Sequence, residues 1–287
     1  RAGVNAGNSI ASGGNYNVVV GDEAGTALTT GDDNVAVGFE ALSTEDTGTR
    51  SVAVGYRALK TQNADVQNYN TAIGYDAGLL ITTGVENILI GGKAGDALTD
   101  ADYNVAVGRA SLTTDTLGSK STAVGFGTLA SQNFTTATDT YNIAIGYNAG
   151  TAVTTGINNT FVGGLAGDSV TTGSYNTLLG SIAGDALTTA NSNVAVGYSA
   201  LSTDTLGAKN VAVGVSALLT QNFTTATDSY NTGVGHNAGK LITTGIRNTL
   251  IGGKTGDEVT TGEGNVAVGY ESLGETTIGD DNVAIGN

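Results

Sequence analysis

A short pattern, Asn-x-x-x-Gly, returns along almost the whole chain at a nearly fixed interval, and this period constrains the fold more than any other feature. There are sixteen copies; twelve of the fifteen spacings between them are 17 residues, and the others are 19, 21 and 21. The copies begin at Asn17, Asn34, Ser51, Asn70, Asn87, Asn104, Ser121, Asn142, Asn159, Asn176, Asn193, Asn210, Asn231, Asn248, Asn265 and Asn282. Such a period predicts a solenoid, in which each repeat buries its apolar side chains against its neighbours.

We call each repeat a rung and number its columns from zero at the Asn position. Column one is Val, Ile or Thr, column three is Val, Ile or Leu, and column four is always Gly. This alternation predicts a short strand that ends in a tight turn, and no segment keeps a helical period. The predicted fold is all-β, a parallel β-solenoid (β-roll) of about 16 rungs with two short strands and two turns per 17-residue coil. We expect columns one and three to face into the coil.

Column two is then expected to face outward. It is Ala in ten rungs, and the rungs with larger residues there have small or polar residues in column five. The two columns therefore exchange volume, as side chains that share one packed space do. We interpret column two as a subunit interface. The candidate interface residues are Ala36, Ala53, Ala106, Ala195, Ala212 and Ala267.

Several columns are expected to form ladders along the solenoid. Tyr and Phe recur in column five, and stacked rungs would align their rings. The Asn of column zero is expected to form a hydrogen-bonded ladder that caps the turns. Column six reads Glu40, Arg57, Asp76 and Lys93 on successive rungs, so neighbouring opposite charges should reinforce the register.

The longer rungs are predicted to carry a recognition surface. Residues 132–139 and 221–228 share one sequence and exceed the length a coil needs, and residues 62–67 are a shorter counterpart. Insertions of this kind lie on one face of a solenoid and often bind partners. Phe134 and Phe223 stand outside the ladder columns and are candidate anchors for a sugar ring or a protein surface. The alternative is that each Phe folds back over its coil.

Composition excludes several classes of protein. The absence of Cys and the single His argue against disulfide scaffolds, zinc sites and cysteine nucleophiles. A net charge of -15 without a basic cluster predicts no nucleic-acid partner, and no stretch nears the roughly 18 apolar residues of a membrane span. The chain begins at Arg1 without a signal peptide, so we expect a fragment of a longer fibre chain. Within it, residues 1–16 form an irregular or capping start and residues 17–287 a single repeat solenoid.

Few residues are candidates for chemistry. Asp168 and Asp185 share column nine on adjacent rungs, and such oxygen-rich pairs can hold Ca²⁺. The alternative is a pair of solvated turn carboxylates, because the calcium-binding Gly-Gly-x-Gly-x-Asp repeat is absent. His236, the single His, occupies column five, where it replaces a ladder Tyr. No nucleophile and base form a unique set, so we predict no catalytic residues, no cofactor apart from possible calcium, and no enzyme activity.

The run Asn-Val-Ala-Val-Gly-Tyr-Ser-Ala-Leu at residues 193–201 resembles the head repeat of trimeric autotransporter adhesins and the repeat of phage tail fibres. The resemblance covers residues 17–287 and implies left-handed coils that pack as a homotrimer. The 17-residue unit differs in length from the adhesin unit, and we expect neither a chaperone domain nor a membrane anchor within residues 1–287.

Together these features predict a structural and adhesive fibre shaft, extracellular at a cell surface or on a virion. Its expected partners are copies of itself, as a homotrimer or fibre, and a cell-surface glycan or protein. Sixteen rungs at ~4.8 Å would span about 75 Å. One alternative is a monomeric ice- or surface-binding solenoid, because Thr-Thr-Gly recurs on several rungs. Another is a β-solenoid enzyme acting on polysaccharide, which requires a carboxylate pair in a cleft.

Overall fold

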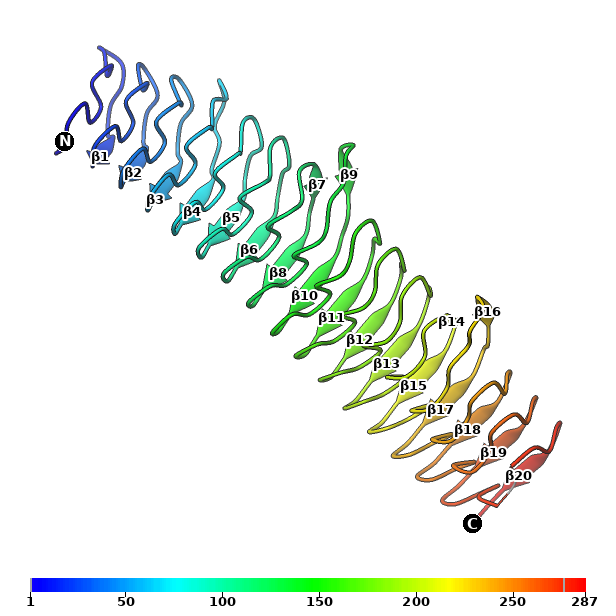
Figure 1. Cartoon of the computed structure of the whole chain (residues 1–287). Helices are drawn as coiled ribbons and strands as arrows, with labels where there is room; N and C mark the ends of the chain where they lie inside the picture. Colours follow the sequence, from blue (N-terminus) through cyan, green and yellow to red (C-terminus); the bar gives the residue numbers. More distant parts are fainter. Residues whose placement is uncertain (1, 276) are drawn as a thin grey trace. The chain divides into compact units, whose positions relative to one another are not determined.

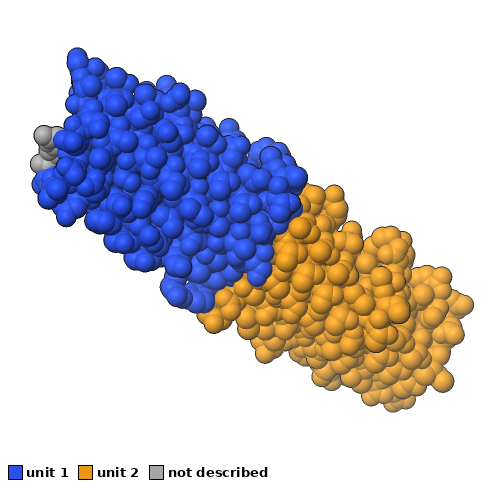
Figure 2. All heavy atoms as spheres, turned by 45° about the horizontal axis from the view of Figure 1, so that its top comes forward, with its two compact units in different colours: residues 1–142 blue, residues 143–287 orange. Residues whose placement is uncertain are grey.

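The computed structural model describes residues 2–275 and 277–287. It is an all-β parallel β-solenoid of about sixteen turns that follow the 17-residue period, as predicted (Figure 1). The chain divides into two compact units, residues 1–142 and 143–287 (Figure 2). Among the described residues, no helix is long and apolar enough to cross a membrane.

The first unit contains seven three-residue strands in one parallel sheet. Equivalent columns stack directly, so that Val35 pairs with Val52 and Ala36 with Ala53. In spatial order the strands are β1 (Val18–Val20), β2 (Val35–Val37), β3 (Val52–Val54), β4 (Thr71–Ile73), β5 (Ile88–Ile90), β6 (Val105–Val107) and β8 (Thr122–Val124). A separate pair, β7 (Gly118–Ser119) with β9 (Thr138–Asp139), joins the 21-residue rung to the rung before it.

The second unit repeats this arrangement with nine strands. Its sheet contains β10 (Ile143–Ile145), β11 (Thr160–Val162), β12 (Thr177–Leu179), β13 (Val194–Val196), β15 (Val211–Val213), β17 (Thr232–Val234), β18 (Thr249–Ile251), β19 (Val266–Val268) and β20 (Val283–Ile285). The small pair is β14 (Gly207–Ala208) with β16 (Thr227–Asp228). Figure 1 shows β9 and β16 on loops at the side of the coil away from the main strands.

Each ordinary coil holds one strand rather than the predicted two. After the strand the chain runs through successive turns, and in residues 2–275 and 277–287 second strands occur only as β7–β9 and β14–β16, which pair each 21-residue rung with the rung before it. Columns six and eight adopt left-handed backbone angles, as at Lys93 (φ 59°) and Gly95 (φ 55°). Repeated left-handed residues reverse the chain too often for an extended segment to form.

The glycine of column four is required for two reasons. It ends each strand with φ between 127° and 144°, a region that residues with a β-carbon rarely adopt. It also lies close to the next rung, because a β-carbon at Gly197 would be 2.5 Å from the carbonyl oxygen of Gly214. The backbone angle is in this range on every rung and the close approach recurs on most of them, which explains why column four is Gly in all sixteen copies.

The predicted orientation of the strands is wrong. Only the middle residue of β2, β6 and β13 is buried, so column two faces inward while columns one and three face outward. No surface is exposed on the candidate interface residues Ala36, Ala53, Ala106, Ala195, Ala212 and Ala267. A residue without accessible surface in the single chain has none to offer to a partner, so these alanines are core residues.

The volume exchange is real, but column two exchanges volume with column eight inside the coil. The pairs with a large residue in column two and Gly in column eight are Val19 with Gly25, Leu89 with Gly95, Phe161 with Gly167, Leu178 with Gly184 and Leu250 with Gly256. A β-carbon at Gly95 would lie 2.7 Å from Cδ2 of Leu89. Seven rungs use the opposite combination, such as Ala195 with Leu201. Each such coil thus holds one large side chain in this space, as close packing requires.

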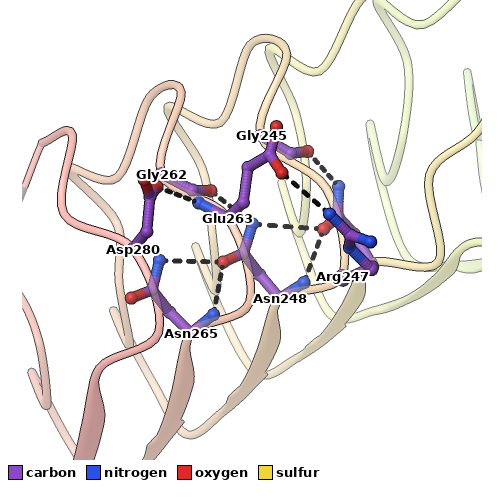
Figure 3. A network of polar contacts seen from close by, with 8 residues as sticks. Gly245, Arg247, Asn248, Gly262, Glu263, Asn265 and Asp280 are labelled. Carbon is purple, nitrogen blue, oxygen red and sulfur yellow. Dashed lines mark hydrogen bonds and ion pairs between the residues drawn. The ribbon is translucent and has the colours of Figure 1, made fainter.

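The Asn ladder is confirmed (Figure 3). Asn248 donates its Nδ2 to the carbonyl of Gly262 at 2.8 Å, and its Oδ1 accepts the backbone N–H of Asn265 at 3.0 Å. Asn265 repeats the first bond with Gly279 at 2.8 Å. Asn248 therefore closes its own coil and joins it to the next one, which satisfies buried backbone groups that the short strands leave unpaired.

Residues 2–16, predicted as an irregular or capping start, follow the path of a further rung without a full strand. Ala2 forms a β-bridge with Val20, and Gly7 donates its N–H to the carbonyl of Ala24 at 2.9 Å. Ala6 is buried in the position of column seven. The pattern search missed this rung because residues 1–16 lack the Asn-x-x-x-Gly pattern.

Candidate functional site

The outward columns one, three and five form an apolar surface along the sheet of each unit, which we call the sheet face. Its exposed large side chains are Val18, Val20, Phe39, Tyr56, Ile73, Tyr75, Ile88 and Phe126 in the first unit, and Ile143, Ile145, Tyr147, Val162, Tyr198, Val215, Ile251, Val266, Val268, Tyr270, Val283 and Ile285 in the second. Parallel in-register pairing places these side chains in continuous rows within each unit. Apolar surface of this continuity marks an interaction site more often than a solvated wall.

Aromatic rings and charges line one border of the sheet face in the first unit. Phe39, Tyr56 and Tyr75 stack in succession with ring centroids 5.2 Å apart, which confirms part of the column-five ladder. Arg57 lies over the Tyr56 ring and binds Asp76 through two hydrogen bonds of 2.8 and 2.7 Å. That bond raises the pKa of the Arg57 guanidinium further above its usual value.

The remaining charges of column six follow the prediction only in part. Glu40 accepts a hydrogen bond from Lys60 at 2.6 Å, so its partner is not the predicted Arg57. Lysine reaches Glu40 because its flexible stem extends from another column of the next rung. The ladder therefore supports the register, but through side chains of more than one column.

The two 21-residue rungs end in the same cluster of a lysine, an aspartate and a tyrosine. Lys209 donates to Asp228 at 2.6 Å and to the Tyr230 hydroxyl at 3.0 Å. These partners raise the pKa of Lys209 to about 12. In the other rung, the bond from Lys120 at 2.5 Å lowers the pKa of Asp139 below its usual value. Both clusters tie the end of an inserted loop to the preceding rung.

The two candidate anchor residues are largely buried. Phe134 and Phe223 are 7% and 6% exposed, so the structure favours the alternative in which each ring folds back over its coil. The ring of Phe223 packs over Gly207, where an added β-carbon would lie 2.8 Å from Cδ2 of the ring. The exposed tips of the loops are instead the Thr-Thr-Ala segments at residues 135–137 and 224–226.

Shallow grooves lie beside the inserted loops. One of about 400 Å³ next to β16 is lined by Thr189, Asn191, Leu206, Ala226 and Asp228, among others. Another of about 330 Å³ lies beside the shorter insertion and includes Arg50 and Asp65. The first combines apolar side chains with hydroxyl, amide and carboxylate groups, whereas charged groups are more prominent in the second.

Carboxylates in the coil interior are the feature that sequence analysis missed. Column eleven holds a fully buried apolar side chain on eight ordinary rungs, as at Leu98 and Leu187, but it holds Glu45, Asp115 and Asp204 on three others. Each of these rungs directly precedes a long rung, whose own column eleven is Gln. The acid-then-Gln pair in an apolar column is the signal in the sequence that could have identified them.

The long rung explains why an acid is needed there. On several ordinary rungs the Gly N–H of column fourteen donates to the next rung's column-twelve carbonyl, as Gly245 does to Thr260 at 3.3 Å. Where the next rung is long, the N–H of Gly207 instead donates to Oδ1 of Asp204 at 2.9 Å. The inserted chain departs from the ladder, and the carboxylate supplies the acceptor that the ladder has lost.

Asp168 and Asp185 lie on adjacent rungs, as expected. Burial raises the pKa of both carboxyls, and repulsion from Asp168 adds to the shift at Asp185. Within the described part of the chain, no group of three or more His, Asp or Glu side chains is placed to hold a metal ion. Calcium binding at this pair stays a prediction. His236 is exposed in column five, where the sequence places a ladder residue.

Comparison with known proteins finds no matching protein-family model, no matching curated protein and no matching solved structure.

Proposed function

We propose that this chain is a non-catalytic structural shaft that assembles with copies of itself through the sheet face. The observation that carries the proposal is the row of exposed Val, Ile, Tyr and Phe side chains along the sheet of each unit. Covering apolar surface is favourable by roughly 25 cal/mol per Å², so even a modest buried area per rung becomes large when it repeats along the chain. A regular solenoid is suited to this role because it presents the same surface on successive rungs.

Three copies are the proposed assembly. A closed cyclic arrangement of two or three copies covers the same face on every copy and leaves none exposed. The resemblance of residues 193–201 to the repeats of trimeric adhesins and phage tail fibres supports three copies. We place the assembled shaft outside the cell, at a cell surface or on a virion.

Attachment is proposed for the opposite side of the coil. The inserted loops lie away from the main strands, so a shaft assembled through the sheet face leaves them accessible (Figure 1). Their exposed Thr-Thr-Ala tips and the groove beside β16 offer hydroxyl, amide and carboxylate groups to a cell-surface glycan or protein.

The assembly is tested by replacing Val266 and Val268 together with lysine. Both side chains are exposed on β19, so the change should leave each coil folded while placing charges within the proposed interface. We expect a trimeric mass in sedimentation equilibrium for the wild type and a monomeric mass for the variant. Thr261→Lys, at an exposed turn of the same unit, is the control and should remain trimeric. A monomeric wild type, or a variant that still assembles, would refute the proposal.

Ice binding is a second candidate, favoured by one observation about the same face. Column one is Thr on six rungs and is followed two residues later by Ile, Val or Leu, as at Thr71 with Ile73 and Thr160 with Val162. A flat, regular array of such side chains can order water, and it would need to stay uncovered. Thermal hysteresis by a monomeric chain would favour this reading over the shaft.

A further inference from the structure

The three buried carboxylates share a contact pattern that the shaft function does not require. Asp204 accepts hydrogen bonds from the Gly207 N–H at 2.9 Å and from the Phe223 N–H at 3.3 Å on Oδ1, and from Gln221 Nε2 at 2.5 Å on Oδ2. Its side chain is fully buried, and each of these partners is an uncharged amide. One carboxylate thus links Gly207 of its own rung to Gln221 and Phe223 of the next, long rung.

The first unit contains the same arrangement twice. Asp115 accepts from Gly118 N–H at 3.1 Å, from Phe134 N–H at 3.0 Å and from Gln132 Nε2 at 2.6 Å. Glu45 accepts the Gly48 N–H at 2.7 Å and Gln62 Nε2 at 2.9 Å, and Asn68 Nδ2 adds a further bond at 3.0 Å.

Each Gln is held in one orientation by the backbone. Asn231 accepts the Asn248 N–H on Oδ1, so its Nδ2 must point to the Gly245 carbonyl and to Oε1 of Gln221, at 2.7 and 2.8 Å. Gln221 therefore presents its Nε2, a donor, to Asp204. Asn70 orients Gln62 in the same way, with Nδ2 2.9 Å from the Gln62 Oε1.

Every group that faces the Asp204 carboxylate is therefore a hydrogen-bond donor, so the side chain at this position must act as an acceptor. A protonated Asp204 would direct its new O–H at the Gln221 amide or at backbone N–H groups, all of which are donors. Gln221 cannot rotate its amide to accept this proton, because that would turn its Nε2 toward the Nδ2 of Asn231.

We infer that Glu45, Asp115 and Asp204 are acid-sensitive latches, which hold the inserted loops closed while ionised and release them when protonated. The loop that opens carries the exposed Thr-Thr-Ala tip and the buried Phe of each 21-residue rung, so acid would expose apolar surface beside the groove. The inference does not depend on the proposed shaft function, since it concerns each coil and its loop within a single chain.

Other charged groups near the loops must be distinguished from the latch. Asp139 and Asp228 pair with Lys120 and Lys209 at the exposed ends of the two identical loops. Near Glu45, Asp46 accepts the Thr47 N–H at 2.7 Å, while Asp65 and Arg50 lie on the adjoining turn. These carboxylates are accessible to water, whereas the three latch residues have no exposed surface.

The test is amide hydrogen exchange on the whole chain between about pH 2 and pH 7, corrected for the intrinsic exchange rate, because an exposed carboxyl in an opened loop titrates near about 4. Opening that takes up one proton should lower loop protection about tenfold per pH unit below about pH 4 and leave it unchanged above about pH 5, where the opened carboxyl stays ionised. Peptides covering residues 133–140 and 222–229 should show this slope, and they can be told apart because Thr140 and Ser229 differ. Residues 82–86, on a rung with apolar Ile81 in column eleven, provide the reference.

Two variants locate the effect. Asp204→Asn should open the loop at residues 222–228 already at pH 7 and abolish its pH slope, while the Asp115 loop in the same molecule keeps its own slope. Asp228→Asn, which removes only the exposed pair, should leave both slopes intact. If Asp204→Asn fails to fold, the wild-type comparison of loops with residues 82–86 and the Asp228→Asn result still decide. Equal slopes in loops and reference, increased loop protection in acid, or loss of the slope in Asp228→Asn would overturn the inference.

Discussion

Leu187 and Asp204 occupy the same interior column on successive rungs, and both are fully buried, yet one is apolar and the other is a carboxylate. Around Leu187 the coil is filled by carbon: a β-carbon at Gly184 would lie 2.9 Å from its Cδ1. Around Asp204 the coil presents N–H groups from Gly207, Phe223 and Gln221. The rung that follows makes the difference, because an ordinary rung supplies a carbonyl to the ladder and a long rung does not.

The comparison teaches that an insertion in a solenoid affects the interior as well as the surface. Four extra residues lead the chain away from the ladder and leave a donor unpaired inside the preceding coil. An unpaired buried donor costs about 1–3 kcal/mol, so the sequence places an acid where the column is otherwise apolar. The same solution occurs at all three insertions, including the shorter one that follows Glu45.

The largest effect is expected from making an ordinary rung resemble the acidic one. Leu187→Asp would bury a carboxylate without the donors that surround Asp204, so we expect a loss of about 4 kcal/mol in the free energy of unfolding. Chemical denaturation followed by hydrogen exchange near residues 184–190 measures it. Leu187→Met, which keeps the volume, is the control and should cost under about 1.5 kcal/mol. A well-tolerated Asp would mean that ordinary rungs also supply donors.

The reverse change should cost somewhat less. Asp204→Leu leaves the N–H groups of Gly207 and Phe223 and the Nε2 of Gln221 without their acceptor, for a loss of about 3 kcal/mol. Adding Gln221→Leu removes one of these donors and restores an apolar column, so the double variant should recover part of the loss. A double-mutant cycle gives the coupling, expected within about 0.5–3 kcal/mol. Simple additivity of the two changes would show that the pair does not act as a unit.

Truncating the Phe of a long rung should have an intermediate effect. Phe223→Ala removes a ring that is 6% exposed and packs over Gly207, so we expect a loss of about 2 kcal/mol. Thermal melting measures this, with the exposed Thr224→Ala as a control that should stay within about 0.5 kcal/mol. If Phe223→Ala left the stability unchanged but abolished partner binding, the prediction that Phe223 anchors a partner would be supported instead.

The smallest effect is expected at the exposed pair of Lys120 and Asp139. The folded pKa of Asp139 is lowered, so the pair's contribution is present above the ordinary carboxyl pKa and disappears as pH falls through the folded value. The raised pKa of Lys120 keeps the contribution until strongly alkaline pH. Lys120→Met should therefore slightly loosen the loop near neutral pH. High salt should reduce the difference, and a salt-independent loosening would point to lost packing of the lysine stem instead.

Local rules made much of the fold predictable. The parallel solenoid, its 17-residue period, the strand at columns one to three and the Asn ladder depend on residues that recur on every rung, so their pattern is visible without coordinates. The glycine of column four was predicted as a turn residue, although its close approach to the next rung is a property of stacked coils. The inserted loops were located for the same reason, because they interrupt the period.

The candidate site was predicted less well, because its residues depend on which side of the strand is inside. Alternation specifies that columns one and three share a face, but it does not say whether that face lies inside or outside. Ala195 looked like an interface residue because the exchange partner of column two was sought in column five rather than in column eight. Because column two rather than columns one and three faces inward, the Val and Ile side chains of columns one and three lie on the sheet face and not in the interior.

The sequence by itself determined the period, the strand and turn positions and the alignment of like columns, since each follows from local backbone preferences repeated at a fixed interval. Only the tertiary structure decided which face of the strand fills the coil, that Phe134 and Phe223 fold back, and that Asp204 is buried. Each of these depends on groups far apart in the chain that meet across the coil. The space between columns two and eight holds one large side chain per coil. At a long rung the ladder lacks a carbonyl acceptor for the Gly207 N–H, and the carboxylate of Asp204 replaces it.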